Sequence, residues 1–143
     1  IEAHNSLKQN HLRDFVSLET DGGLKIGRDV IIAALLGAEY YAFGTALLMA
    51  VRCIFCRSCQ TNKCPVGITT QDEEYRKKFK GAVEKVMNYI TLLAEDVREW
   101  LAKMGYKSLD EVIGHNYLLT VKDIPLAKKF DFSKLFEYIE GPN

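Results

Sequence analysis

Apolar and polar residues along the first half of the chain recur in a pattern that predicts short helices and strands in turn. Four residues near the start share one helix face, namely His4, Leu7, His11 and Phe15. That helix ends within residues 7–15, and residues 16–20 alternate as a strand. A helix follows over 28–37, then an apolar strand over 40–43 and a helix over 46–52. Such alternation favours parallel strands and an α/β layer architecture.

The second half of the chain has mainly helical patterns. One apolar face of a long helix is formed by Val83, Val86, Met87, Ile90, Leu93, Ala94, Val97 and Leu101. Gly105 is expected to end this helix. Residues 108–111 match a capping box for a short helix that ends near Gly114. Two more short helices are predicted over 121–129 and 133–139, which completes a helical tail.

Composition narrows the classes of function. Of the 143 residues 48% are hydrophobic, and 19 basic residues balance 19 acidic ones, so nothing indicates a nucleic acid or an anionic membrane as partner. No apolar run reaches the length of a membrane span. Four cysteines lie within a dozen positions, which favours a metal or cluster site in a reducing compartment over a disulfide framework. Because the chain opens with Ile1, we expect a piece of a longer polypeptide or a processed subunit.

The cysteine loop carries the strongest chemical signal. Its thiols are Cys53, Cys56, Cys59 and Cys64, and Pro65 follows the last of them. The spacing C-x2-C-x2-C-x4-C-P is one residue longer in its last gap than the cluster-binding run of bacterial ferredoxins. Backbone N–H groups and Arg57 would offset the negative charge of an iron–sulfur cluster. A structural zinc site and free or disulfide-paired thiols are the alternatives, although zinc sites usually separate their paired cysteines by longer loops.

Two glycine loops precede predicted helices. Asp21, Gly22 and Gly23 follow the first strand, and Gly44 and Thr45 follow the second, with Thr45 as the expected N-cap. Glycine lets the backbone approach an anion closely, and a helix N-terminus favours negative charge. Two such units in succession are similar to the phosphate site of (β/α)8 barrels. We therefore expect a phosphate group to bind these two loops.

The chain is too short for a whole barrel, which takes roughly 200–250 residues. We expect the C-terminal portion of a (β/α)8 TIM barrel, its last two β/α units, followed by a helical tail. Residues 1–71 would form the end of the barrel with the cluster loop, and residues 72–143 a helical C-terminal extension that packs on it. With unpaired strand edges, the chain is not expected to fold without the remainder of the barrel from the same or another chain.

Several ordered motifs resemble the FMN-binding synthase domain of glutamate synthase. They are His4-x-x-Leu7-x-x-Asn10-x-Leu12-Arg13, Asp21-Gly-Gly-Leu-Lys-x-Gly27-Arg-Asp29-Val30, Ala34-Leu-Leu-Gly37-Ala38, Phe43-Gly-Thr45 and Cys59-x4-Cys64-Pro-Val-Gly67-Ile-x-Thr70-Gln71. The resemblance extends to Leu101-Ala-x-Met-Gly105 and Ser108-Leu-Asp-Glu-x-Ile-Gly114, and so covers residues 1–120.

The resemblance implies a flavin and iron–sulfur oxidoreductase that makes L-glutamate from 2-oxoglutarate and glutamine-derived ammonia, through 2-iminoglutarate. By position, it assigns a [3Fe-4S] cluster to Cys53, Cys59 and Cys64. It assigns the FMN phosphate to Gly22, Gly23, Gly44 and Thr45, while Asp21 would orient the loop or contact the ribityl chain. The implied partners are a glutaminase domain or subunit and an electron donor, either ferredoxin or an NAD(P)H-linked subunit. The implied location is the cytoplasm, or the plastid stroma in a photosynthetic eukaryote.

Some residues keep two interpretations. Cys56 departs from the three-cysteine pattern and is either a fourth ligand, giving a [4Fe-4S] cluster, or a buried thiol that packs as a small hydrophobe. Lys25 and Arg28 would meet the phosphate or form a solvated rim. Gln71 would hydrogen-bond near the flavin, whereas His4 is expected to pack rather than to catalyse. Two other functions stay open, a related FMN-dependent amino-acid or amine synthase with another amine donor and a non-catalytic electron-transfer subunit.

Overall fold

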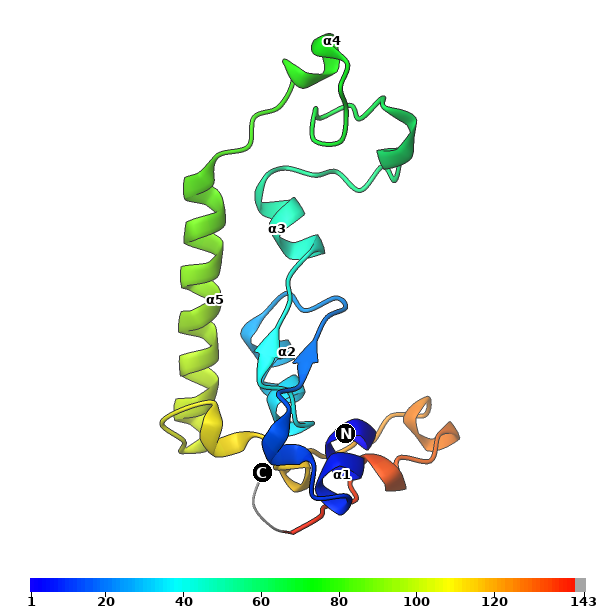
Figure 1. Cartoon of the computed structure of the whole chain (residues 1–143), viewed down its shortest axis with the longest axis vertical. Helices are drawn as coiled ribbons and strands as arrows, with labels where there is room; N and C mark the ends of the chain where they lie inside the picture. Colours follow the sequence, from blue (N-terminus) through cyan, green and yellow to red (C-terminus); the bar gives the residue numbers. More distant parts are fainter. Residues whose placement is uncertain (141–143) are drawn as a thin grey trace.

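In the computed structural model, which describes residues 1–140, the chain forms five α-helices and two short strands (Figure 1). The helices are α1 (Glu2–Gln9), α2 (Gly27–Leu35), α3 (Thr45–Ala50), α4 (Glu73–Arg76) and α5 (Val83–Met104), and the strands are β1 (Glu19–Thr20) and β2 (Tyr40–Tyr41). Short 3-10 turns and loops connect them. The last three residues of the predicted unit 72–143 lie outside the described part of the chain.

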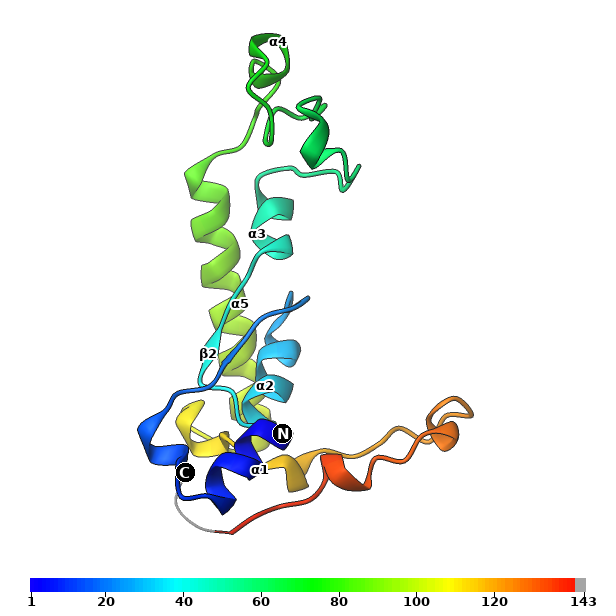
Figure 2. The same ribbon diagram turned by 45° about the vertical axis from the view of Figure 1, so that its right-hand side comes forward.

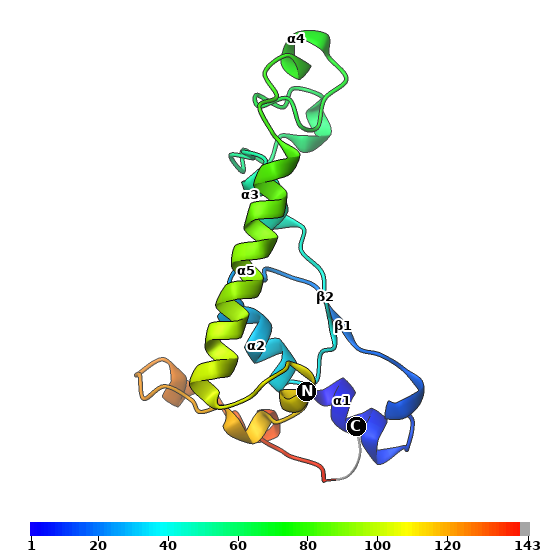
Figure 3. The ribbon, with the colours of Figure 1, turned by 90° about the vertical axis from the view of Figure 1, so that its left-hand side faces the viewer.

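The two strands lie side by side and run parallel. Glu19 is opposite Tyr40 and Thr20 is opposite Tyr41, and α2 connects the strands (Figures 1 and 3). The Ala42 N–H donates to the Thr20 carbonyl at 2.9 Å and continues the pairing past β2. The predicted parallel pairing is confirmed, although both strands are shorter than their apolar patterns, because each finds only one neighbour among the described residues. This mixed architecture is compatible with a fragment of an α/β domain.

The hydrophobic core forms between α2 and α5. Its buried residues are Val30, Ile31, Ala34, Leu35, Leu93, Val97, Leu101 and Val112. Gly27 allows the two helices to approach closely, since a Cβ at this position would lie 2.6 Å from the backbone nitrogen of Val97. The Gly27 N–H also donates to the Asp96 carboxylate at 2.6 Å, which satisfies an amide in the first turn of α2. The core therefore joins α2, from the first half of the chain, to α5, from the second half.

Helix α5 confirms the predicted long helix, but only part of its apolar face is covered. Leu93 and Val97 are buried, whereas Val83 and Met87 are 71% and 62% exposed. The helix ends at Gly105, whose φ of 84° is in the left-handed region that glycine adopts readily. In the described part of the chain, neither α5 nor any other helix is long and apolar enough to cross a membrane.

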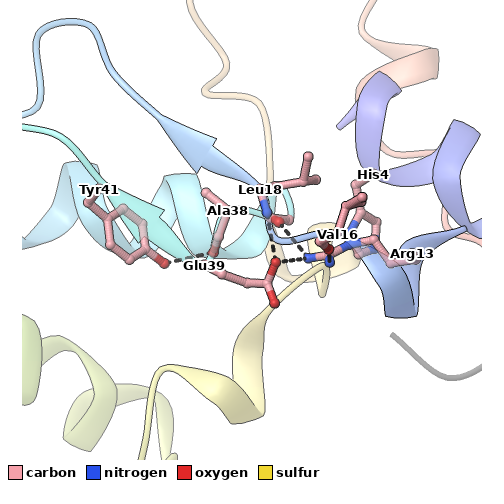
Figure 4. Close-up of polar contacts among 8 residues, drawn as sticks. His4, Arg13, Val16, Leu18, Ala38, Glu39 and Tyr41 are labelled. Carbon is pink, nitrogen blue, oxygen red and sulfur yellow. Dashed lines mark hydrogen bonds and ion pairs between the residues drawn. The ribbon is translucent and has the colours of Figure 1, made fainter.

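A buried polar cluster fastens the N-terminal helix to the sheet (Figure 4). The Arg13 side chain donates to His4 Nδ1 at 3.2 Å, to the Gly37 carbonyl at 3.2 Å and to the Glu39 carboxylate at 2.6 Å. Glu39 also accepts the Leu18 N–H at 2.8 Å, at the start of β1. Burial and the Arg13 charge lower the pKa of His4 to about 4, so its ring is neutral and can accept the hydrogen bond. His4 is thus buried as part of the packing.

Two predicted helix ends are wrong for local reasons. The first helix stops at Gln9 because His11 takes a left-handed φ of 55°, and Phe15 belongs to a separate 3-10 turn. Thr45 is not an N-cap, because α3 already includes it and Gly44 occupies the cap position. The first turn of α3 has no side-chain capping hydrogen bond.

The tail also departs from its predictions. The capping box is wrong, because the Glu111 carboxylate accepts the Lys107 N–H at 3.0 Å and precedes only a 3-10 turn. The two predicted tail helices are replaced by 3-10 turns at Ala127–Lys129 and Ser133–Leu135. Pro125 has no N–H to donate, which interrupts the first of these helices.

Candidate functional site

The first glycine loop follows β1 and turns back into α2. Gly22 and Gly23 have φ values of 116° and 82°, which an L-residue adopts only under strain, and a Cβ at either position would meet open space. Asp21 accepts the Gly22 N–H at 2.6 Å, so an anion that used this amide would displace its carboxylate. Lys25, in the loop, and Arg28, in the first turn of α2, are both exposed, and their positive charges would attract an anion.

The second glycine loop follows β2 and opens α3. Gly44 is the cap and Thr45 the first residue of this helix, and both are exposed. The amides of a first helical turn have no acceptor within their own helix. Because β1 and β2 are parallel, both glycine loops leave the same carboxyl edge of the pair (Figures 1 and 2). Each glycine loop thus lies between a strand and a helix, at the same edge of the strand pair.

An open cavity of about 500 Å³ lies beside the first loop, between α1, β1 and α2. Gly22 and Gly23 line it together with Thr20 and Asp29. The second loop is not part of its lining. Two of the predicted phosphate residues thus border this cavity, and the other two lie at the neighbouring strand end.

The cysteine loop leads from α3 to α4 at the end of the molecule remote from the tail (Figures 1 and 3). Cys64 is buried and Cys53 half-buried, whereas Cys56 and Cys59 are exposed, and all four thiols are free. Within residues 1–140, no group of three or more His, Cys, Asp or Glu side chains is close enough to hold a metal ion. The donor chemistry fits an iron–sulfur cluster, but the four side chains are not gathered into one site.

The backbone of the cysteine loop is unusually contorted. Four non-glycine residues take left-handed φ values between 54° and 72°, namely Arg52, Phe55, Arg57 and Asn62. Each such residue costs about 1 kcal/mol or more, and such conformations gather at ligand-binding loops. Most of the unfavourable left-handed backbone conformations among the described non-glycine residues therefore lie in the segment that carries the thiols.

Cys64 lies among backbone donors. The hydrogen bond from the Thr69 N–H is the largest cause that lowers the pKa of the Cys64 thiol to about 7, with further bonds from Ile68 and Val66. Burial opposes this shift. The turn after Cys64 therefore favours its thiolate, which is the form of cysteine that ligates metals.

A side-chain clip closes the segment around Cys64. Asn62 Oδ1 accepts the Gln71 N–H at 2.6 Å, and the Thr70 hydroxyl donates to the Asn62 carbonyl at 2.6 Å. Helix α4 packs against this segment, since a Cβ at Gly67 would lie 2.5 Å from the Tyr75 carbonyl. No sequence pattern singled out Asn62, and the one signal for it is the tolerance of asparagine for left-handed backbone.

The segment around the cysteines is positively charged. Between residues 52 and 80, seven Lys or Arg residues outnumber three Asp or Glu residues, and all seven are exposed. Arg57 lies between Cys56 and Cys59. This excess would offset the negative charge of a thiolate-ligated cluster.

The amino-acid sequence of this chain matches a family model and several known proteins. Residues 1–107 match the family model described as the conserved region in glutamate synthase. A ferredoxin-dependent glutamate synthase from Antithamnion sp. is 51% identical over 127 residues, which are 89% of this chain and 8% of that protein. A glutamate synthase (NADPH) large chain from Azospirillum brasilense is 56% identical over 118 residues, or 82% of this chain and 8% of that protein. A large chain of the same description from Bacillus subtilis (strain 168) is 46% identical over 144 residues, or 98% and 10%.

Proposed function

This chain belongs to the glutamate synthase family, and on that premise we propose that it forms part of an oxidoreductase that makes L-glutamate. The reaction combines 2-oxoglutarate with glutamine-derived ammonia and reduces the resulting 2-iminoglutarate. The observation that carries the proposal is the parallel strand pair. It has one glycine loop after each strand, at the same edge, and the cysteine loop follows in the chain after α3. The chain spans a tenth or less of the length of the relatives it matches, so the full reaction requires further segments.

The proposed architecture is the end of a (β/α)8 barrel. In this arrangement β1 and β2 are the last two barrel strands, and α2 is the crossover helix between them. Other segments, from the same or another chain, would pair with their outer edges. The exposure of Tyr40 on β2, at 60%, supports such a missing neighbour.

Flavin mononucleotide fits the two glycine loops. A Cβ at Gly22 or Gly23 would meet open space, and the exposed residues Gly44 and Thr45 begin α3 at the same edge of the strand pair. These four residues would hold the phosphate, and Asp21 would orient the loop or contact the ribityl chain. Bound there, FMN would supply the hydride for reduction of the imine.

The cysteine loop would hold a [3Fe-4S] cluster through Cys53, Cys59 and Cys64. Cys64 already accepts backbone hydrogen bonds, which supports its role as a ligand. A cluster at this position would relay electrons to the flavin site. The exposed cations of residues 52–80 would offset its charge.

The remaining partners follow from the reaction. A glutaminase domain or subunit would release the ammonia, and ferredoxin or an NAD(P)H-linked subunit would supply electrons. Relatives described as ferredoxin-dependent and as NADPH enzymes both match the chain, so both donor classes enter the proposal. We place the protein in the cytoplasm or in the plastid stroma, where cysteine thiols stay reduced.

The test uses the complete protein that contains this chain. Purified protein should contain FMN and iron. After anaerobic chemical reduction, 2-oxoglutarate together with glutamine should restore the absorbance of oxidised flavin and yield glutamate, whereas neither compound alone should do so. Recovery only with another oxo acid or amine donor would favour a related synthase. Iron without flavin would favour the electron-transfer subunit, and absence of both would refute the proposal.

A further inference from the structure

Two side chains of α5 hold the segment that leads from the first glycine loop into α2. The Tyr89 hydroxyl donates to the Lys25 carbonyl at 2.5 Å, and the Asp96 carboxylate accepts the Gly27 N–H at 2.6 Å. Tyr89 and Asp96 are two helical turns apart, so both lie on the same face of α5. That face packs against α2 (Figure 3), and the two contacts join residues 64 and 69 positions apart in the chain.

A third side chain fixes the same segment from within α2. Asp29 accepts the Lys25 N–H at 2.9 Å and the Ile26 N–H at 3.1 Å. The amides of residues 25, 26 and 27 therefore all have carboxylate acceptors, and the Lys25 carbonyl has a donor. Residues 21–24, by contrast, have one hydrogen bond within the described part of the chain, from the Gly22 N–H to Asp21. The two glycines of this loop are thus held mainly through residues 25–27.

The position of Gly23 depends on this anchored segment. Only Leu24 separates Gly23 from Lys25, and a step of two residues spans at most about 7 Å. A displacement of Lys25 therefore moves Gly23 as well. Neither Tyr89 nor Asp96 lines the cavity beside the loop, so both would act on a ligand there through the backbone that they hold.

The two anchoring side chains differ in charge. Burial and the nearby Asp29 carboxylate raise the pKa of Tyr89, so its hydroxyl keeps its proton and donates throughout the neutral range. Asp96 has two opposing effects, because its hydrogen bond orders the backbone whereas its negative charge would repel a phosphate group. Removal of this carboxylate therefore changes phosphate affinity in opposite directions, according to which effect is larger.

We propose that Tyr89 and Asp96 are positioning residues for phosphate binding at the first glycine loop. By holding residues 25–27 against α5, they keep Gly22 and Gly23 ordered before a ligand binds, which lowers the entropy cost of binding. The inference rests on the proposed FMN site, and it adds α5 to the elements that determine affinity for the phosphate. Its effect is expected for FMN and not for riboflavin, which lacks the phosphate.

The experiment measures the affinity of the flavin-free complete protein for FMN and for riboflavin by flavin fluorescence. Tyr89→Phe removes only the hydroxyl, so FMN should bind about 3-fold to 10-fold more weakly, as for the loss of one hydrogen bond. Riboflavin affinity should not change. Tyr41→Phe is the matched control, because the Tyr41 hydroxyl donates to the Ala38 carbonyl at 2.8 Å, outside the loop. This control should bind both flavins as the wild type does.

Two variants of Asp96 separate its hydrogen bond from its charge. Asp96→Ala removes the acceptor and should bind FMN several-fold more weakly than the wild type. Asp96→Asn should bind FMN at least as tightly as the wild type, because an amide oxygen can accept the Gly27 N–H and the repulsive charge is gone. Glu95→Ala removes an exposed carboxylate from the preceding position of α5 and should leave FMN affinity unchanged.

Equal FMN affinity of wild type and Tyr89→Phe would overturn the inference, as would tighter FMN binding by Asp96→Ala. Parallel losses of FMN and riboflavin would also overturn it, because α5 would then act on the fold as a whole. Failure of the proposed function has a different result, since the wild type would then bind FMN no more tightly than riboflavin, or bind neither. A wild type that prefers FMN, with variants that share its preference unchanged, would refute the positioning role alone.

Discussion

Substitution of Gly23 by alanine would measure the contribution of the first glycine loop to phosphate binding. Gly23 has a φ of 82°, and an added Cβ would project into open space that a phosphate would share. The left-handed backbone costs an L-residue about 1–2 kcal/mol, but this strain is present with and without ligand. Loss of one hydrogen bond to a charged group adds about 1.5–3 kcal/mol, and this part is specific to the complex. FMN affinity should therefore fall by roughly 10-fold to 150-fold.

Gly105→Ala is a matched control, because Gly105 has a φ of 84° and also faces open space. FMN titration of the flavin-free complete protein, followed by flavin fluorescence, should show a weakened Gly23→Ala variant and an unchanged control. Riboflavin, which lacks the phosphate, should bind wild type and Gly23→Ala equally. Equal FMN affinity of wild type and Gly23→Ala would refute the phosphate assignment. Parallel losses of FMN and riboflavin would show that the loop acts only through its fold.

Three further outcomes follow from other contacts. Acidification from pH 6.5 to about 4 should destabilise the packing of α1. The pKa of His4 is about 4 in the folded chain, so between these pH values the unfolded chain binds more protons than the folded chain. The free energy of unfolding should fall by at most about 3 kcal/mol over this pH range. Hydrogen-exchange protection of the α1 amides that does not decrease over the same range would contradict this. Arg13→Ala should destabilise the same region by about 3 kcal/mol, because the Glu39 carboxylate loses its 2.6 Å partner; undiminished exchange protection would argue against it. Asn62→Gly keeps the left-handed backbone but removes the Gln71 clip, so chelators should remove iron several-fold faster, as for a loss of about 1 kcal/mol; equal rates would exclude a role for the clip.

The strand–helix–strand unit and the long helix were predictable because they depend on short-range periodicity. Val30 and Ala34 face the core as helical spacing requires. Helix ends were less predictable, because a single residue decides them. His11 takes a left-handed φ although its neighbours favour a continued helix, and Gly44 starts α3 without any side-chain cap. Such choices depend on tertiary contacts that no local pattern contains.

The residues of the candidate site were likewise predictable only in part. Gly22 and Gly23 were predictable because positive φ belongs largely to glycine. The partly buried ion pair between Arg13 and Glu39 was not predictable, because 26 residues separate two charges that pair only after the strands align. Periodicity carries no information about such a contact. The positions of the thiols relative to one another were equally beyond prediction, since no repeating pattern governs an irregular loop.

The separation of the four thiols can be explained by the free-energy terms of the cysteine loop. The buried Cys64, supported by backbone donors and by the Asn62 clip, is fixed by the chain itself. Cys56 and Cys59 are exposed, and ordering each loop residue costs about 1–2 kcal/mol of backbone entropy. The few hydrogen bonds of the loop, at about 1 kcal/mol each, do not offset that cost over a dozen residues. Metal–thiolate sites contribute on the order of 10 kcal/mol, which is enough. Cluster binding at a preformed Cys64, rather than chain packing, would therefore draw the other thiols together.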